Sequence, residues 1–241
     1  MTAFRAFRPE ALTFLRGLKK NNRREWFEDR RQVYMHEIVE PLRALVDELD
    51  VRFAKLAPEF MGDPKRSPFR IYRDVRFSKD KSPYKTHAAL WMYHRAPGRG
   101  VGKEVDGGAG FYVHLEPGAC MVAGGIWMPP RPSLAKVRVH FSEDLAGWKK
   151  AIGGGAFKKR FESLNTGDPG AILKRIPRGF DESHPAAAWL RYNSFTVSAD
   201  YTDAEMLAPT FVDKAMQDFA LMRPMCRWLN RALGYLPAKS R

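Results

Sequence analysis

Apolar residues recur every three or four positions through residues 1–57, the spacing that places them on one face of a helix. Pro9 suits the first turn of such a helix. Asn21 and Asn22 interrupt the pattern, so we expect them to end a first helix and cap a second. Pro41 should kink or divide this second helix, because proline removes a helical hydrogen bond.

The pattern changes to alternation of apolar and polar residues in the middle of the chain, residues 67–129. Side chains that alternate with a period of two predict strands, and the short turns between them favour antiparallel pairing. A glycine-rich stretch, residues 95–109, predicts a loop. The predicted strands cover residues 69–77, 87–93, 111–115 and 120–128.

Residues 130–241 return mostly to helical spacing. Ser133 is a plausible N-cap of one helix, and Pro224 should kink a last helix or helix pair at residues 209–233. One more strand is expected at residues 194–201. The fold class that follows is α+β, with a central, mainly antiparallel sheet of about five strands and helices from both ends of the chain. We expect a single domain over residues 1–241; the alternative is a boundary near residue 130.

Charge changes this picture at one place. The chain has a formal net charge of +14, and residues 65–85 hold eight basic residues against two acidic ones, a net +6. Such a concentration attracts anionic ligands or polyanions. The basic residues are Lys65, Arg66, Arg70, Arg73, Arg76, Lys79, Lys81 and Lys85.

Arg73 is the unusual member of this group. On a strand it shares a face with four apolar residues, and Asp74 points the other way. A buried guanidinium needs a partner, so its partner must come from elsewhere in the fold or from a ligand. The apolar residues are Phe69, Ile71, Val75 and Phe77.

Two functions and one structural alternative follow. The first is a site for a phosphate- or carboxylate-bearing small molecule, because the arginine fork binds two oxygens at once. The second is a basic face for RNA or DNA, on which Tyr72, Phe77 and Tyr84 stack bases. The third is a purely architectural ion-pair network. The first assigns ligand binding to Arg70, Arg73, Arg76, Lys81 and Lys85, orientation of the arginines to Asp74, and the pocket wall to Tyr84, His114 and Trp127.

The remaining chemistry is sparse. The six histidines show no H-x-x-x-H spacing, and we predict neither a metal nor a cofactor. His114 lies on the polar face of a predicted strand with Tyr112 and Glu116, where it could act as a general acid or base or simply be a surface histidine. Whether the protein is an enzyme stays open.

The two cysteines are far apart in apolar surroundings, which predicts reduced, buried thiols in a cytoplasmic protein. No apolar run approaches the ~18 residues that a membrane span needs, so no membrane partner is expected. The sequence gives no indication of oligomeric state.

Four motifs carry a family resemblance. The longest is R-x-x-R-D-x-R-F-S-x-D-K-x-P-Y-K, from Arg70 to Lys85; the others are Asn21–Phe27, Gly124–Pro129 and Pro177–Phe180. Together they resemble the family called domain of unknown function 2461 across nearly the whole chain. The resemblance implies a compact single-domain protein of unassigned activity, and it assigns no catalytic role to any residue of this sequence.

Overall fold

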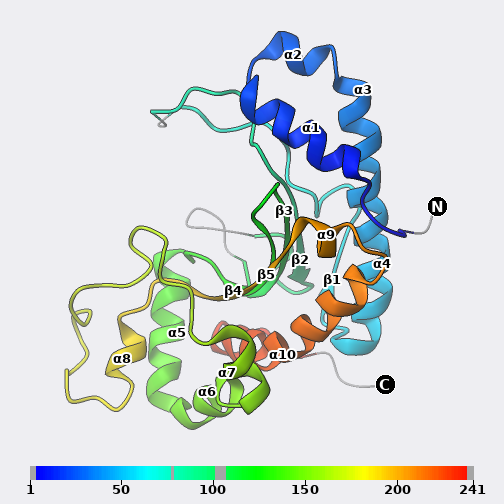
Figure 1. Cartoon of the computed structure of the whole chain (residues 1–241). Coiled ribbons are helices and arrows are strands. Elements are labelled where there is room, and N and C mark those ends of the chain that lie inside the picture. The colour runs from blue at the N-terminus through cyan, green and yellow to red at the C-terminus, as the bar shows by residue number, and fades with distance from the viewer. Residues whose placement is uncertain (1–3, 77–78, 101–106, 238–241) are drawn as a thin grey trace.

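The structure is a computed structural model that describes residues 4–76, 79–100 and 107–237. Its centre is a five-stranded antiparallel sheet in the order β1-β2-β3-β4-β5, with helices from both ends of the chain around it (Figure 1). This confirms the predicted α+β class. The strands are β1 (Phe60–Met61), β2 (Ala88–His94), β3 (Gly110–Leu115), β4 (Cys120–Ile126) and β5 (Phe195–Tyr201).

The N-terminal part is helical, as predicted. Asn21 ends the first helix. The predicted second helix is divided near Glu28 rather than at Pro41. Pro41 lies in the first turn of a helix that follows a π-helical turn without a break. That wider turn accommodates the missing N–H, which is why the proline does not divide the helix. The elements are α1 (Pro9–Lys20), α2 (Arg24–Glu28), α3 (Arg31–Tyr34), η1 (Met35–Val39) and α4 (Glu40–Leu56).

The rest of the chain contributes further helices and the fifth strand. Ser133 is not the predicted N-cap, because the helix already begins at Arg131 with Pro130 in the cap position. Of the predicted last helix or helix pair, the structure has a single helix, with Pro224 inside it. The helices are α5 (Arg131–Glu143), α6 (Leu145–Ile152), α7 (Gly155–Phe161), α8 (Ala187–Leu190), α9 (Asp203–Met206) and α10 (Phe211–Ala232).

The core lies between one face of the sheet and the helices α4 and α10. The Phe111 ring of β3 lies 4.8 Å from that of Phe53 and 5.1 Å from that of Phe219. A Cβ atom on Gly124 would come within 2.8 Å of Met222 Sδ, so the glycine allows α10 to approach β4.

Charges that enter this core are paired. Asp218 of α10 is 5% exposed and accepts two hydrogen bonds from Arg160, at 2.7 and 2.8 Å. The Tyr201 hydroxyl donates a third at 2.6 Å. A buried carboxylate with this many donors is compensated for its lost hydration.

Both cysteines are free and buried, as predicted. Burial raises the pKa of the Cys120 thiol to about 11, so it stays protonated near neutral pH. In the part of the chain that the structure describes, no helix is long and apolar enough to cross a membrane.

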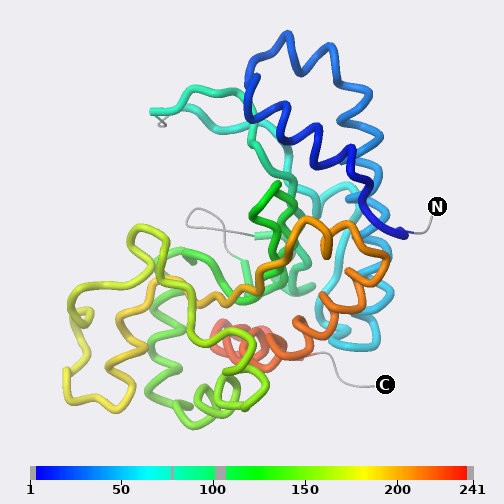
Figure 2. Tube along the Cα trace, viewed as in Figure 1, coloured from blue at the N-terminus to red at the C-terminus, as the bar shows by residue number. Residues whose placement is uncertain are grey.

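Residues 70–76 and 79–85, here called the arm, project from the body beside α1 and α2 (Figures 1 and 2). The strand predicted at residues 69–77 is wrong, because isolated pairing replaces a ladder: Tyr72 bridges Tyr84, and Lys85 N–H donates to the Ile71 carbonyl at 2.8 Å. Within the described residues, the outgoing and returning segments of the arm pair only with each other. A two-stranded pair without a third strand is marginally stable. The short strand β1, rather than this segment, completes the five-stranded sheet. Phe77 lies outside the described residues.

Candidate functional site

The outer part of the arm pairs its charges internally. Arg73 forms an ion pair with Asp80, on the returning side of the arm. Arg76 binds Asp74 through two nitrogens, with Nη2 at 2.6 Å from Oδ2 and Nε at 3.0 Å from Oδ1. Hydrogen bonds from Arg76 lower the pKa of Asp74 to about 2. The partner that Arg73 requires therefore comes from the fold itself.

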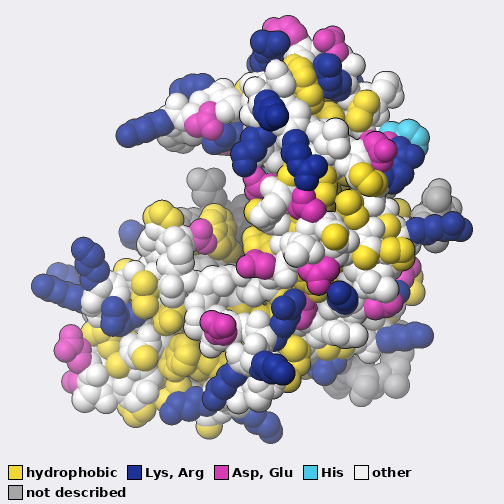
Figure 3. Space-filling view, viewed as in Figure 1, with side chains coloured by type: hydrophobic (Ala, Val, Ile, Leu, Met, Phe, Trp, Pro, Cys, Tyr) yellow, Lys and Arg dark blue, Asp and Glu magenta, His cyan; other side chains and the backbone are white. Residues whose placement is uncertain are grey.

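Lys81 is also bound within this outer part, where its Nζ donates to the Val75 carbonyl at 2.9 Å. Lysine and arginine side chains stand out from the projecting arm in Figure 3. The side chain of Arg76 is 76% exposed. The structure thus does not bring Arg73, Arg76 and Lys81 to one point.

Lys85 and Arg70 have a different setting, at the base of the arm. The Lys85 ammonium lies 5.4 Å from the Phe69 ring centroid, and the Arg99 guanidinium carbon lies 4.8 Å from the same centroid. Burial, and then the charges of Arg70 and Arg99, lower the pKa of Lys85. We call Arg70, Lys85 and Arg99 the cation cluster.

Lys85 and Arg99, the two half-buried members of the cation cluster, lack the compensation found at other half-buried cations. Arg138 donates to the Leu190 carbonyl at 3.0 Å, and Arg223 donates to the Leu56 carbonyl at 2.8 Å. Within the described ranges, no hydrogen bond or ion pair joins the Lys85 or Arg99 head to another residue, and Arg99 Nε is buried without a partner. Such a group loses hydration without regaining a hydrogen bond.

Tyr84 anchors the arm. Its ring is 2% exposed and stacks on Phe27 at 4.2 Å between centroids. The Asn22 side chain accepts from the Tyr84 N–H at 3.1 Å and donates to the Tyr84 carbonyl at 2.8 Å. The expected capping role of Asn22 is wrong, because Arg23 occupies the cap position of α2. Asn22 instead clamps the arm to the body, next to Lys85.

His114 lies on the sheet face opposite the α10 side, near the cation cluster. The Phe69 ring lies 6.0 Å from that of Tyr112, whose hydroxyl lies 2.9 Å from His114 Nδ1. His114 Nε2 lies 3.1 Å from Glu116 Oε2. Because a carboxylate only accepts, the neutral imidazole carries its proton on Nε2 and accepts from Tyr112 on Nδ1.

A second histidine joins this group. The His87 ring stacks on that of His114 with centroids 4.4 Å apart. Burial, with a contribution from the charge of His114, lowers the pKa of His87 to about 4, so His87 is neutral near pH 7. One ligand atom from each of His87, His114 and Glu116 lies within 4.8 Å of the other two.

The sequence placed His114 with Tyr112 and Glu116 on one strand face, but it did not connect them with His87. His114 and Glu116 are two positions apart in the sequence, the spacing that places two side chains on one face of a strand, and that signal was visible. His87 joins them only through the sheet, because Ala88 pairs with Leu115. No pattern of histidine spacing contains that information.

Trp127 does not belong with the other predicted residues. It follows β4, six positions beyond Met121, the partner of His114, which corresponds to about 20 Å along a strand. Its indole N–H donates to Asp168 Oδ2 at 2.8 Å, and the side chain is 46% exposed.

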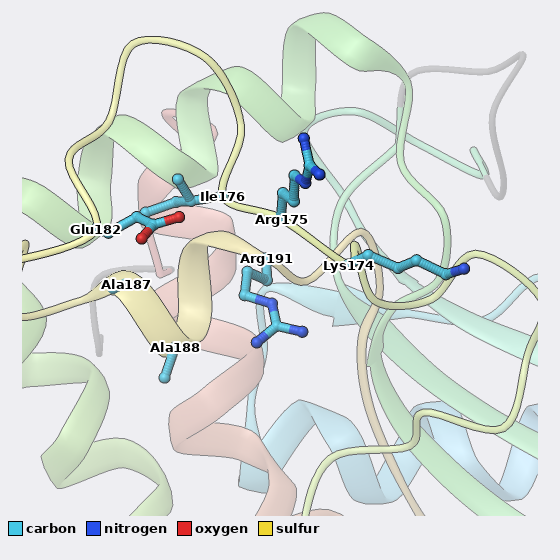
Figure 4. A pocket seen from close by; sticks show the side chains of 7 residues that line it. All are labelled: Lys174, Arg175, Ile176, Glu182, Ala187, Ala188 and Arg191. Atoms are coloured by element: carbon cyan, nitrogen blue, oxygen red, sulfur yellow. The ribbon is translucent and has the colours of Figure 1, made fainter.

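A separate pocket of about 290 Å³ lies between α8 and the preceding segment (Figure 4). Lys174 points away from the other labelled side chains in that view, and Arg191 Nε donates to the Leu173 carbonyl at 2.9 Å. The basic groups therefore do not converge on one point. The pocket is lined by Lys174, Arg175, Ile176, Glu182, Ala187, Ala188 and Arg191.

Comparison with known proteins gives a family and no activity. No curated protein and no solved structure matches the chain. A family model described as "Conserved hypothetical protein (DUF2461)" matches residues 10–228, a range that includes the arm, the cation cluster and the histidine group. The chain therefore belongs to the DUF2461 family.

Proposed function

We propose that the protein binds a small molecule bearing a phosphate or carboxylate group at the cation cluster. The observation that carries this proposal is the half-buried pair of Lys85 and Arg99, which has no counter-ion among the described residues. An anion at this place would supply the missing partner. It would also raise the pKa of Lys85 toward its ordinary value.

The surroundings favour a small ligand rather than a free ion. Arg70 and Arg99 each offer a planar fork that binds two oxygens, and Lys85 adds a point charge. The Phe69 ring, in contact with Tyr112, provides an apolar surface for the rest of the ligand. Figure 3 shows the molecule hollowed between the arm and the part that holds α5.

The proposal narrows the set of residues expected from the sequence. Arg70 and Lys85 remain ligand-binding residues, and Arg99 joins them from the glycine-rich loop. Arg73 and Arg76 are paired with aspartates and serve to shape the arm. We assign Tyr84 to anchoring.

The test compares two lysines of the same motif. Thermal melts of wild type, Lys85→Met and Lys81→Met are recorded with phosphate, sulfate, nucleotides, sugar phosphates and dicarboxylates. A ligand at 100 times its Kd stabilises a fold by about 2.7 kcal/mol. We expect at least one small anion to raise the Tm of wild type and Lys81→Met but not of Lys85→Met.

Lys81→Met is the matched control, because it removes the same charge from the outer arm. Equal shifts in both variants would show that the anion binds elsewhere or only through net charge. If no anion shifts any of the three proteins, the cation cluster is not a binding site.

A second candidate is RNA or DNA binding along the arm. It is favoured by the exposed basic residues of the projecting arm and by Tyr72, whose side chain is 48% exposed and could stack on a base. Binding of this kind weakens steeply with salt. A short RNA that shifts the melt at low salt, loses its effect near physiological salt and is affected by Lys81→Met would support this candidate over the first.

A further inference from the structure

The histidine group next to the cation cluster has the composition of a metal site. His114 and Glu116 stand on one face of β3 and its end, and His87 immediately precedes the neighbouring β2. One ligand atom from each residue lies within 4.8 Å of the other two. Two imidazoles and a carboxylate form a ligand set that zinc enzymes use, with the fourth position left for water or substrate.

Two of the three ligand atoms already have the separation that a metal ion requires. Tetrahedral Zn²⁺ with bonds of ~2.1 Å places its ligand atoms about 3.4 Å apart. His114 Nε2 and Glu116 Oε2 already lie 3.1 Å apart. The third ligand atom, from His87, lies within 4.8 Å of the other two, and the His87 ring makes no hydrogen bond to the described residues that would hold it back from the ion.

The second ligand shell is also present. The Tyr112 hydroxyl lies 2.9 Å from His114 Nδ1. When Nε2 binds a metal, Nδ1 carries the proton and donates it to the phenol oxygen, which can accept as well as donate. Lys19 lies 3.5 Å from Glu116 Oε1, so it holds one carboxylate oxygen and leaves Oε2 for the ion.

We propose that His87, His114 and Glu116 bind one divalent transition-metal ion of the Zn²⁺ class, with at least one coordination position open. Positive charge around the site limits the affinity. Lys19 pairs with Glu116, and Lys85 and Arg73 act electrostatically on His87. Because two of the three ligands are imidazoles, the site is expected to prefer metals that bind imidazole strongly over Mg²⁺ or Ca²⁺, which take oxygen ligands.

Binding is measured with the full-length protein after treatment with a chelator. Zn²⁺ is titrated in competition with a chromophoric chelator, and Co²⁺ is titrated while its visible d–d absorption is recorded. We expect one equivalent per chain and the intense bands of a four- or five-coordinate Co²⁺ ion. His87→Gln and Glu116→Gln should each weaken Zn²⁺ binding at least tenfold, and Tyr112→Phe by about 10–100-fold through the second shell.

The chain provides a matched control in His36 and Glu40. Their side chains form a histidine–carboxylate pair of the same length, 3.1 Å, on an exposed helical surface, outside the three-ligand group. His36→Gln should leave the Zn²⁺ affinity unchanged.

Three results would overturn the proposal. They are the absence of a one-to-one complex, equal Zn²⁺ affinities in wild type and the ligand variants, or equal effects of His36→Gln and His87→Gln. Melts of each variant without metal show whether it is folded. If one ligand variant fails to fold, the other and Tyr112→Phe still decide, together with the Co²⁺ spectrum of wild type.

Discussion

Asn22→Ala should destabilise the protein far more than Asn21→Ala, although the two residues are adjacent and of the same type. Asn22 makes two hydrogen bonds to the backbone of Tyr84, at 2.8 and 3.1 Å. Tyr84 is only 2% exposed, so truncation leaves one N–H and one carbonyl with little access to water. Each unsatisfied buried group costs about 1–3 kcal/mol.

Allowing for partial rehydration, we expect Asn22→Ala to lower the free energy of unfolding by about 2–4 kcal/mol. Asn21 donates its side chain to the Gly17 carbonyl at 3.0 Å, but the Asn21 backbone N–H bonds the same carbonyl. Asn21→Ala therefore leaves no orphaned group, and its cost should stay below about 1 kcal/mol. Urea denaturation at pH 7 measures both.

Hydrogen exchange at Tyr84 tests the mechanism directly. Asn22→Ala should expose the Tyr84 amide to exchange, whereas Asn22→Asp keeps an acceptor for it and should preserve much of its protection. Because Lys85 follows Tyr84, small-anion binding should weaken in Asn22→Ala as well. Equal costs for Asn21→Ala and Asn22→Ala would refute the clamp.

Lys85→Met should raise the free energy of unfolding by about 0.5–1 kcal/mol after solvent screening, because burial and like charges make this charge unfavourable; a melt without a gain would contradict this. Asp218→Ala should lower the free energy of unfolding, measured by urea denaturation, by about 3 kcal/mol, because it leaves the donors of Arg160 and Tyr201 without an acceptor. Asp213, whose side chain is 61% exposed, is the control, and Asp213→Ala should cost less than about 1 kcal/mol. Similar costs would count against the buried network. Burial lowers the pKa of His94 below its ordinary 6.5, so the unfolded chain takes up the proton first and stability should fall from pH 7 to pH 5. His94→Gln should reduce that loss and His36→Gln should not; identical losses in all three proteins would refute the sign.

Much of the fold could be predicted because the hydrophobic period is local information. The spacing of apolar residues predicted α1, the last helix and four of the five strands close to their observed bounds. The error at residues 69–77 has a physical cause: alternation shows that a segment can form a strand, but a strand also needs a partner along its length. The actual first strand, Phe60–Met61, is too short to show any period.

The candidate site was harder to predict because its parts meet only in the folded chain. The basic motif identified Arg70 and Lys85, but Arg99 comes from a glycine-rich loop after β2. The partner of Arg73 is Asp80, seven positions away across the arm, and no local rule distinguishes it from Asp74. The histidine group depends on the β2–β3 register, which brings His87 next to His114 and Glu116, 27 and 29 positions further along the chain.

The distribution of paired and unpaired charge gives the strongest reason to place the function at the base of the arm. Where this chain buries a charge for structure, it supplies partners, as at Asp218 and at Glu59, which accepts two hydrogen bonds from Arg227. The described residues supply none to the heads of Lys85 and Arg99, and the neighbouring group centred on His114 gathers polar atoms on a sheet face. The unpaired cations cost folding free energy if nothing binds there. A bound anion would offset the cost of the cations, and its negative charge would also offset the positive surroundings of the histidines and so favour a metal ion there. The two proposed ligands would therefore stabilise each other's binding as well as the fold.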